Sequence, residues 1–313
     1  MFSGGVIALL APGQGSQAPG MFTPWLELDG ARERVAEWSE AAGLDLLRLG
    51  TTAEAEEIQD TAVTQPLIVA LSLLAFDHLR AQTDVPADVV FAGHSVGELA
   101  AAAAAGVFSP VDAMTLAGLR GREMAAACSL APTGMAAVMK GDPDEVLAWL
   151  DKHDLVPANR NGAGQTVAAG LLSDLDAAIA EPPAGVKVIR LKVAGAFHTK
   201  YMEPAQEALR AKATGIEVRD PAHRLLSNAD GQVVTSGKEM LDRLVAQVVL
   251  PVRWDLCMDT LRELGATTLA ELPPAGALVG LARRELKGAT IVGMKTPEQV
   301  AEVAELIKSE AIA

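Results

Sequence analysis

Residues 92–98, with the sequence AGHSVGE, constrain the fold of this chain more than any other stretch. They follow the short apolar run 89–91 and precede the alanine-rich segment 99–105. A strand, a G-x-S-x-G turn and a helix in that order predict a nucleophile elbow. Gly93 and Gly97 permit the strained dihedrals and close backbone approach that such a turn needs, so Ser95 should project its Oγ beyond the strand. The alternative, a serine that only caps a helix, is less favoured by these flanking segments.

Further short apolar runs predict the rest of an α/β domain around this turn. Helices are expected between them, at 31–42, at 52–58, from Gln65-Pro66 to Leu79, from a Ser109 cap to about Ala127, and at 202–213. Together the runs indicate a mostly parallel five-strand sheet. The expected strands are 6–10, 89–91, 224–227, 268–272 and 290–293.

The pattern changes after Pro132. Strands are predicted at 135–139, 155–159, 165–170 and 186–193, and helices at 142–150 and 173–180. A turn is expected at Asn161-Gly162. The order βαββαβ is that of a ferredoxin-like unit. We therefore predict an inserted small domain, residues 131–194, within a large domain made of residues 1–130 and 195–313.

Charge and cysteine content restrict the partners and the compartment. The 313-residue chain has a formal net charge of −14, which argues against nucleic acid and anionic membranes as main partners. Its two cysteines, Cys128 and Cys257, lie far apart, as expected in a reducing cytoplasm. The apolar run 6–10 is too short to span a membrane and follows no basic segment, so we interpret it as a strand.

A serine nucleophile requires a base, and His198 is the best placed of five histidines. His78 lies within a helical run, His153 and His223 lie in polar loops, and His94 adjoins the serine and should point away from it. His198 follows the run 193–197 at a predicted strand-to-helix corner where the chain re-enters the large domain.

Three questions stay open from the residues alone. Asp142, Asp144 and Asp151 fall in the inserted unit, and no acid between Ser95 and His198 ends a predicted strand of the large domain, so either an acid from elsewhere or a neutral acceptor orients the histidine. The loop 12–17, PGQGSQ, is either an anion cradle or an ordinary turn. Arg120 and Arg122 both have apolar neighbours at helical spacing, and the pattern does not choose between them.

Seven segments together resemble the malonyl-CoA:acyl carrier protein transacylases and the related acyltransferase domains of fatty acid and polyketide synthesis. The resemblance covers nearly the whole chain and implies a hydrolase-like large domain with a mostly parallel sheet and a ferredoxin-like insertion. The segments are PGQGSQ at 12–17, TQP at 64–66, GHSVGE at 93–98, GLRGR at 118–122, Asn159, GAFH at 195–198 and PVRW at 251–254.

The resemblance implies a ping-pong transfer of malonyl from malonyl-CoA, through a malonyl ester on Ser95, to the phosphopantetheine thiol of acyl carrier protein. His198 would be the base, and the main-chain N–H groups of Gln14 and Val96 would form the oxyanion hole. Gln247 would orient the histidine through its main-chain carbonyl.

For the substrate, the resemblance selects Arg120, whose guanidinium can grip a carboxylate through two parallel bonds. It also implies a pocket lined by Phe197 and Asn159. The loop LPPAG at 272–276 departs from the family's form and receives no role. We expect a cytoplasmic monomer whose partners are acyl carrier protein and a coenzyme A thioester, with no cofactor and no metal.

Two other functions are compatible with parts of the pattern. A serine esterase or thioesterase would release the acid to water and needs no carboxylate clamp. A non-catalytic carrier-binding module could keep the fold, but the retained Ser95, His198 and Gln14 argue against it.

Overall fold

The computed structural model describes residues 5–312, so residues 1–4 and 313 of the predicted large domain lie outside the described range. Its larger sheet has the strand order β11-β10-β1-β2-β7-β8. The first five of these strands pair in parallel, and β8 is antiparallel to β7. The five predicted strands are confirmed; the two-residue β8 carries too little pattern to be predicted. The strands are β1 (Val6–Ala11), β2 (Val90–Gly93), β7 (Arg224–Leu226), β8 (Val233–Val234), β10 (Ala266–Glu271) and β11 (Thr290–Gly293).

Helices cover both faces of this sheet, which explains why its central strands are apolar throughout. In β1, Leu9 belongs to one hydrophobic core and Leu10 to another, because successive side chains point to opposite faces. The Leu9 side packs against α3, α4, α5 and α12, and the Leu10 side against α10 and α11. These helices are α3 (Thr61–Gln82), α4 (Gly97–Ala104), α5 (Pro110–Cys128), α10 (Trp254–Glu263), α11 (Ala277–Glu285) and α12 (Pro297–Ile312).

Side-chain caps mark the starts of α3 and α5. Ser109 caps α5 as predicted, with its Oγ accepting the N–H of Asp112 at 3.0 Å. The prediction for α3 is wrong at its start: Asp60 caps that helix by accepting the N–H of Ala62, and Pro66 lies inside the helix. The predicted helix 52–58 is also wrong, because one α-helix ends at residue 51 and a separate 3₁₀ turn begins at residue 57. The other helices outside the second sheet are α1 (Ala31–Ala42), α2 (Leu46–Thr51), α8 (Glu203–Ala213) and α9 (Gly237–Gln247), with short 3₁₀ turns η1 (Trp25–Glu27), η2 (Glu57–Gln59) and η3 (Lys200–Met202).

Helix α3 is the one helix of the described residues that is long and apolar enough to cross a membrane. However, 78% of its apolar window is buried inside the protein, against α1, α4, α5 and α12. Its composition is thus that of a core helix.

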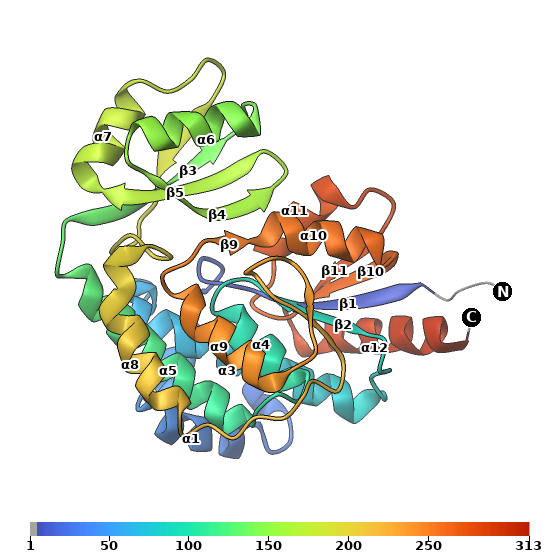
Figure 1. The fold of residues 1–313 in the computed structure, drawn as a ribbon. Helices are drawn as coiled ribbons and strands as arrows, with labels where there is room; N and C mark the ends of the chain where they lie inside the picture. The colour runs from blue at the N-terminus through green and yellow to red at the C-terminus, as the bar shows by residue number, and fades with distance from the viewer. Residues whose placement is uncertain (1–4, 313) are drawn as a thin grey trace.

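The second sheet has the order β6-β3-β5-β4-β9. The predicted βαββαβ order of its elements is confirmed, but the turn between β4 and β5 is Ala163-Gly164 and not Asn161-Gly162. Helices α6 and α7 cover one face, and the other face turns toward the larger sheet (Figure 1). The elements are β3 (Thr133–Met139), α6 (Pro143–Lys152), β4 (Val156–Gly162), β5 (Gln165–Leu171), α7 (Leu172–Ala180) and β6 (Lys187–Arg190).

One strand of this second sheet comes from outside the segment 131–194. Strand β9 (Val252–Arg253) pairs in parallel with β4, where Asn159 is opposite Val252. It is separated from the end of α9 by residues 248–251 and directly precedes α10. The chain between these two helices therefore reaches across to the smaller sheet.

Candidate active site

The predicted elbow is present between β2 and α4. Ser95 has φ of 52°, in the left-handed region that side chains rarely adopt. A Cβ on Gly93 would lie 2.2 Å from the carbonyl oxygen of Gly97, and one on Gly97 would lie 2.3 Å from the carbonyl oxygen of Ala11. Only glycine fits at either position. The two glycines thus allow the chain to turn tightly enough to expose the serine at the end of the strand.

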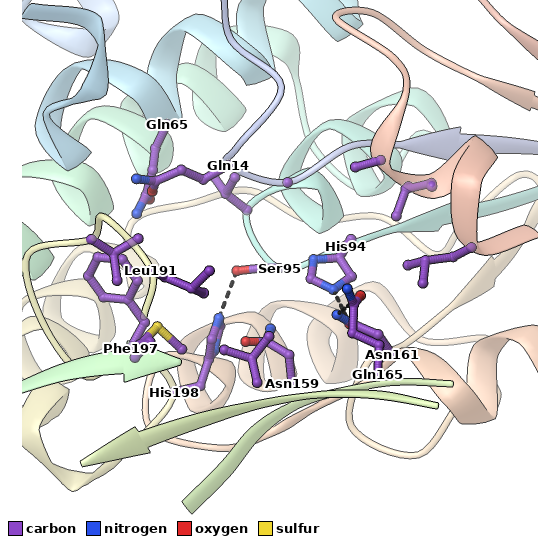
Figure 2. A pocket seen from close by; sticks show the side chains of 18 of the residues that line it. Gln14, Gln65, His94, Ser95, Asn159, Asn161, Gln165, Leu191, Phe197 and His198 are labelled. Carbon is purple, nitrogen blue, oxygen red and sulfur yellow. Dashed lines mark hydrogen bonds between the residues drawn. The ribbon is translucent and has the colours of Figure 1, made fainter. Parts of the chain in front are cut away.

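Ser95 and His198 point toward one another (Figure 2), with 2.8 Å between the Oγ and Nε2 atoms. The other ring nitrogen, Nδ1, lies 2.8 Å from the main-chain oxygen of Gln247. A carbonyl can only accept, so Nδ1 carries the proton and Nε2 is free to accept from the serine hydroxyl. Of the alternatives left open by the sequence, the geometry matches a neutral acceptor in place of an acid.

The His198 ring is 3% exposed, and its environment keeps it uncharged. Burial first, and the nearby charge of Arg120 second, lower the pKa of His198 to about 3, although the Gln247 carbonyl acts in the opposite direction. At neutral pH the ring is therefore a free base, which is the state that can accept a proton from serine.

The other four histidines make no hydrogen bond to Ser95 Oγ within the described residues, although His94 lines the same cavity. His94 turns away from the serine side chain: its Nε2 donates to Oδ1 of Asn161 on β4 at 2.9 Å. His78 contacts Gln82 on α3, and His223 contacts the main chain of Pro86. The elimination that selected His198 agrees with these positions.

The two candidate arginines of α5 separate clearly. Arg120 is 3% exposed and lies in the site: Nη1 donates to Gln65 Oε1 at 2.6 Å, and Nη2 donates to Gln247 Oε1 at 2.9 Å and to Ser95 Oγ at 3.2 Å. Burial lowers its pKa to about 10, which leaves the guanidinium charged at neutral pH. Arg122 instead donates to the main-chain oxygen of Ala42 at the end of α1.

A cavity of about 340 Å³ connects these groups and is bounded by both sheets. Phe197 and Leu191 lie on one side of Ser95 (Figure 2), while Asn159 comes from β4. Helix α11 closes the opposite side. The predicted residues Gln14, Val96, Arg120, Asn159 and Phe197 line this cavity together with Ser95 and His198.

The loop 12–17 lies against the elbow, since the main-chain N–H of His94 donates to the oxygen of Ala11 at 2.9 Å. This contact brings Gln14 beside the serine. Val96 is the residue that precedes α4, and its main-chain N–H has no acceptor among the described residues, whereas those of Gly97 and Glu98 donate to the oxygens of His94 and Ser95. Both positions suit donors to a developing oxyanion.

Sequence reasoning missed Asn228 and Glu98. Asn228 follows β7; its Oδ1 accepts the main-chain N–H of Ser95, and its Nδ2 donates to the oxygen of Gly93, both at 2.8 Å. Glu98, 1% exposed, accepts the N–H of Asn228 at 2.6 Å and an N–H of the Gln247 side chain. Burial raises the pKa of Glu98 to about 8, although both hydrogen bonds act to lower it. Residue type alone gave no signal for Asn228; Glu98 was part of the quoted motif but had no role.

Within residues 5–312, His, Cys, Asp and Glu form no cluster of three or more that could hold a metal ion. The chemistry available at this site is that of a serine hydroxyl, a neutral imidazole and a buried guanidinium. Such a set can form an ester with an acyl group and can bind an anionic group next to it.

Comparisons with known proteins agree with one another. The acyl transferase domain family matches residues 9–311. The malonyl CoA-acyl carrier protein transacylase of Mycobacterium tuberculosis strain H37Rv is 55% identical over 302 residues, covering 96% of this chain and 100% of that protein. The crystal structure of MCAT from Mycobacterium tuberculosis has a TM-score of 0.93 at 55% identity, covering 96% and 99% of the two chains. A malonyl-transacylase solved in complex with a type II PKS acyl-carrier protein has a TM-score of 0.89 at 28% identity, covering 96% and 99%.

Proposed function

The chain belongs to the family of acyl transferase domains, and from that premise we infer that it transfers malonyl from malonyl-CoA to the phosphopantetheine thiol of acyl carrier protein. The curated relatives at 55% identity carry that activity in their name, and the match covers almost all of both chains. A structural neighbour solved with an acyl carrier protein supports the same partner. Such enzymes serve fatty acid or polyketide synthesis.

The observation that carries the proposal is the convergence of two groups on one oxygen. Ser95 Oγ lies 2.8 Å from the neutral base His198 and 3.2 Å from the buried guanidinium of Arg120. A hydrolase of neutral esters needs only the first contact. A cation at the second position suits an acyl group that ends in a carboxylate.

The reaction follows from these positions. Ser95 Oγ attacks the thioester carbonyl carbon while His198 Nε2 takes its proton, and main-chain N–H groups of Gln14 and Val96 stabilise the oxyanion. Collapse breaks the C–S bond, and coenzyme A leaves with the proton from His198. The thiol of the carrier then gives its proton to His198 and attacks the malonyl ester; collapse breaks the C–O bond, and Ser95 Oγ takes the proton back from His198. These steps use side chains and main-chain groups only, and we propose that no cofactor takes part.

The finer fold assignment belongs to the same proposal. We propose that the larger sheet and its helices form a hydrolase-like domain from residues 1–130 and 195–313, with a ferredoxin-like domain at 131–194. The βαββαβ order and the sheet order β6-β3-β5-β4 support the second assignment. We also propose that the enzyme works as a cytoplasmic monomer, in keeping with a net charge of −14 and two cysteines that lie far apart.

The test is the intact mass of the full chain after mixing with malonyl-CoA. One malonyl group should be added, and holo acyl carrier protein should remove it and become malonylated. Ser95→Ala should show no adduct. Release of free malonate without carrier malonylation would identify a thioesterase instead, and an adduct on Ser95→Ala would refute the assigned nucleophile.

A further inference from the structure

Arg120 is a buried cation whose direct hydrogen-bond acceptors are all uncharged. They are the side-chain oxygens of Gln65 and Gln247 and the hydroxyl of Ser95. An isolated charge in such a place is costly unless an opposite charge lies near. Before a substrate carboxylate arrives, the positive charge therefore needs another source of compensation.

Glu98 is the buried carboxylate on the other side of the Gln247 side chain. Gln247 Nε2 donates to Glu98 Oε2, while Gln247 Oε1 accepts from Arg120 Nη2 at 2.9 Å. One carboxamide thus joins an anion to a cation, with its donor on the acidic side and its acceptor on the basic side. The charge of Arg120 acts to lower the pKa of Glu98, and the charge of Glu98 acts to raise the pKa of Arg120, as expected for such a pair.

The Gln247 amide has three acceptors: its Nε2 lies 3.2 Å from the main-chain oxygen of Ser95 and 3.3 Å from Asn228 Oδ1, and its shortest contact is with Glu98 Oε2. Glu98 accepts at both of its oxygens. Oε1 accepts the main-chain N–H of Asn228 at 2.6 Å, and Oε2 accepts from Gln247. A carboxylate can accept twice, whereas a carboxamide has one acceptor and one donor. Only the carboxylate satisfies both neighbours at once.

We propose that Glu98 in its ionised form is a positioning residue for acyl selection: it orients the Gln247 carboxamide toward Arg120 and supplies the charge that holds the guanidinium ready for the substrate's carboxylate. This inference rests on the proposed function. Glu98 does not reach Ser95 Oγ or the base and acts through Gln247. The main-chain N–H of Asn228 is fixed at the end of β7, whereas the Gln247 side chain can turn, so a disturbance at Glu98 passes to Gln247.

The decisive variant is Glu98→Gln, which keeps the size of the side chain and removes one acceptor and the charge. A donor would then face Gln247 Nε2, the Gln247 amide would turn, and its NH₂ group would face the guanidinium. A charge-assisted hydrogen bond to Arg120 is lost, so the ratio of malonyl to acetyl kcat/KM should fall roughly 10- to 100-fold. The assay is run at about pH 9, above the pKa of about 8 that burial gives Glu98, so that the wild-type carboxylate is ionised.

A second variant, Gln247→Met, removes the bridging amide but keeps both charged residues and the main-chain oxygen that holds His198. The same fall in the malonyl-to-acetyl ratio is expected. In an Arg120→Ala background, Glu98→Gln should change the ratio no further, because the group that it positions is absent.

Glu271→Gln is the matched control. Glu271 is also a buried carboxylate, but its oxygens accept main-chain N–H groups of Gly276, Leu278 and Val279 at the start of α11. This variant should lose stability and keep the wild-type ratio. An equal loss of malonyl and acetyl transfer in Glu98→Gln and Gln247→Met, or a changed ratio in Glu271→Gln, would overturn the inference. Wild-type enzyme that transfers no malonyl would refute the proposed function itself, which separates the two failures.

Discussion

Replacing Arg120 by alanine tests how the acyl pocket chooses its substrate. The guanidinium lies beside Ser95 Oγ at 3.2 Å, so a malonyl ester on that oxygen would place its free carboxylate within reach. A paired guanidinium and carboxylate form two charge-assisted hydrogen bonds, each contributing about 1.5–3 kcal/mol. Their loss, about 3–6 kcal/mol, should lower malonyl kcat/KM by a factor on the order of 10² to 10⁴.

Acetyl transfer should respond in the opposite way. An acetyl group leaves the buried guanidinium of the wild type without a carboxylate partner, and the alanine variant removes that mismatch. We therefore expect Arg120→Ala to retain or increase acetyl transfer. The variant should also raise the pKa of His198, because the charge of Arg120 helps to lower it. Rates of transfer from both acyl-CoAs to carrier protein, measured over a range of pH, report both effects.

Arg122→Ala is the control from the same helix. Its guanidinium donates to the main-chain oxygen of Ala42 at 3.0 Å, so the variant should lose about 1 kcal/mol of stability and keep its acyl preference. A change of preference in Arg122→Ala, with none in Arg120→Ala, would refute the assignment.

Three further predictions follow from the site. With the pKa of His198 near 3, malonyl kcat/KM should show no acidic limb near pH 6.5. Because the folded pKa of His198 lies below its unfolded value, the free energy of unfolding should fall as the pH drops from about 6.5 toward 3. The fall should be smaller in His198→Ala. A rate profile with a limb near 6.5 would contradict this. Gly97→Ala places a Cβ 2.3 Å from the Ala11 oxygen and should cost about 1–3 kcal/mol in urea unfolding, whereas Gly280→Ala, where a Cβ meets open space, should not; equal costs would contradict the packing argument. Phe197 lines the pocket, so malonyl-CoA should be preferred to methylmalonyl-CoA by roughly 10- to 200-fold, with a smaller preference in Phe197→Ala; equal wild-type rates would show that the ring does not select.

Local signals were sufficient to predict the strands of the larger sheet and the elbow. A buried parallel strand is a short apolar run, and a sharp strand-to-helix turn needs glycine on both sides of Ser95, so each feature can be read within a few residues. The start of α3 was predicted wrongly because Pro66 resembles a first-turn proline, while the real cap, Asp60, lies six residues earlier. The turn at 163–164 was missed because Asn161 and Gly162 are ordinary turn residues that here continue the strand.

The contacts around the serine could not be predicted in the same way, because they join distant segments. Glu98, Asn228 and Gln247 meet only after α4, β7 and α9 have packed together. Helical spacing could not separate Arg120 from Arg122, since both have apolar neighbours along α5 and differ only in which neighbouring segment each meets.

Strand β9 has a consequence for anyone who exchanges parts between related enzymes. A chimera cut at residues 131 and 194 would look like a clean swap of a unit that is continuous in sequence. However, the recipient would still supply Val252 and Arg253 as the last strand of the donor's sheet, and His94 as the hydrogen-bond donor to Asn161. We expect such grafts to fold poorly unless residues 251–255 travel with the insert, because Arg160 of β4 also pairs with Asp255 just beyond that strand. The unit that can be exchanged is therefore discontinuous and consists of residues 131–194 and 251–255. Its smaller piece begins four residues after Gln247, whose main-chain oxygen accepts from His198.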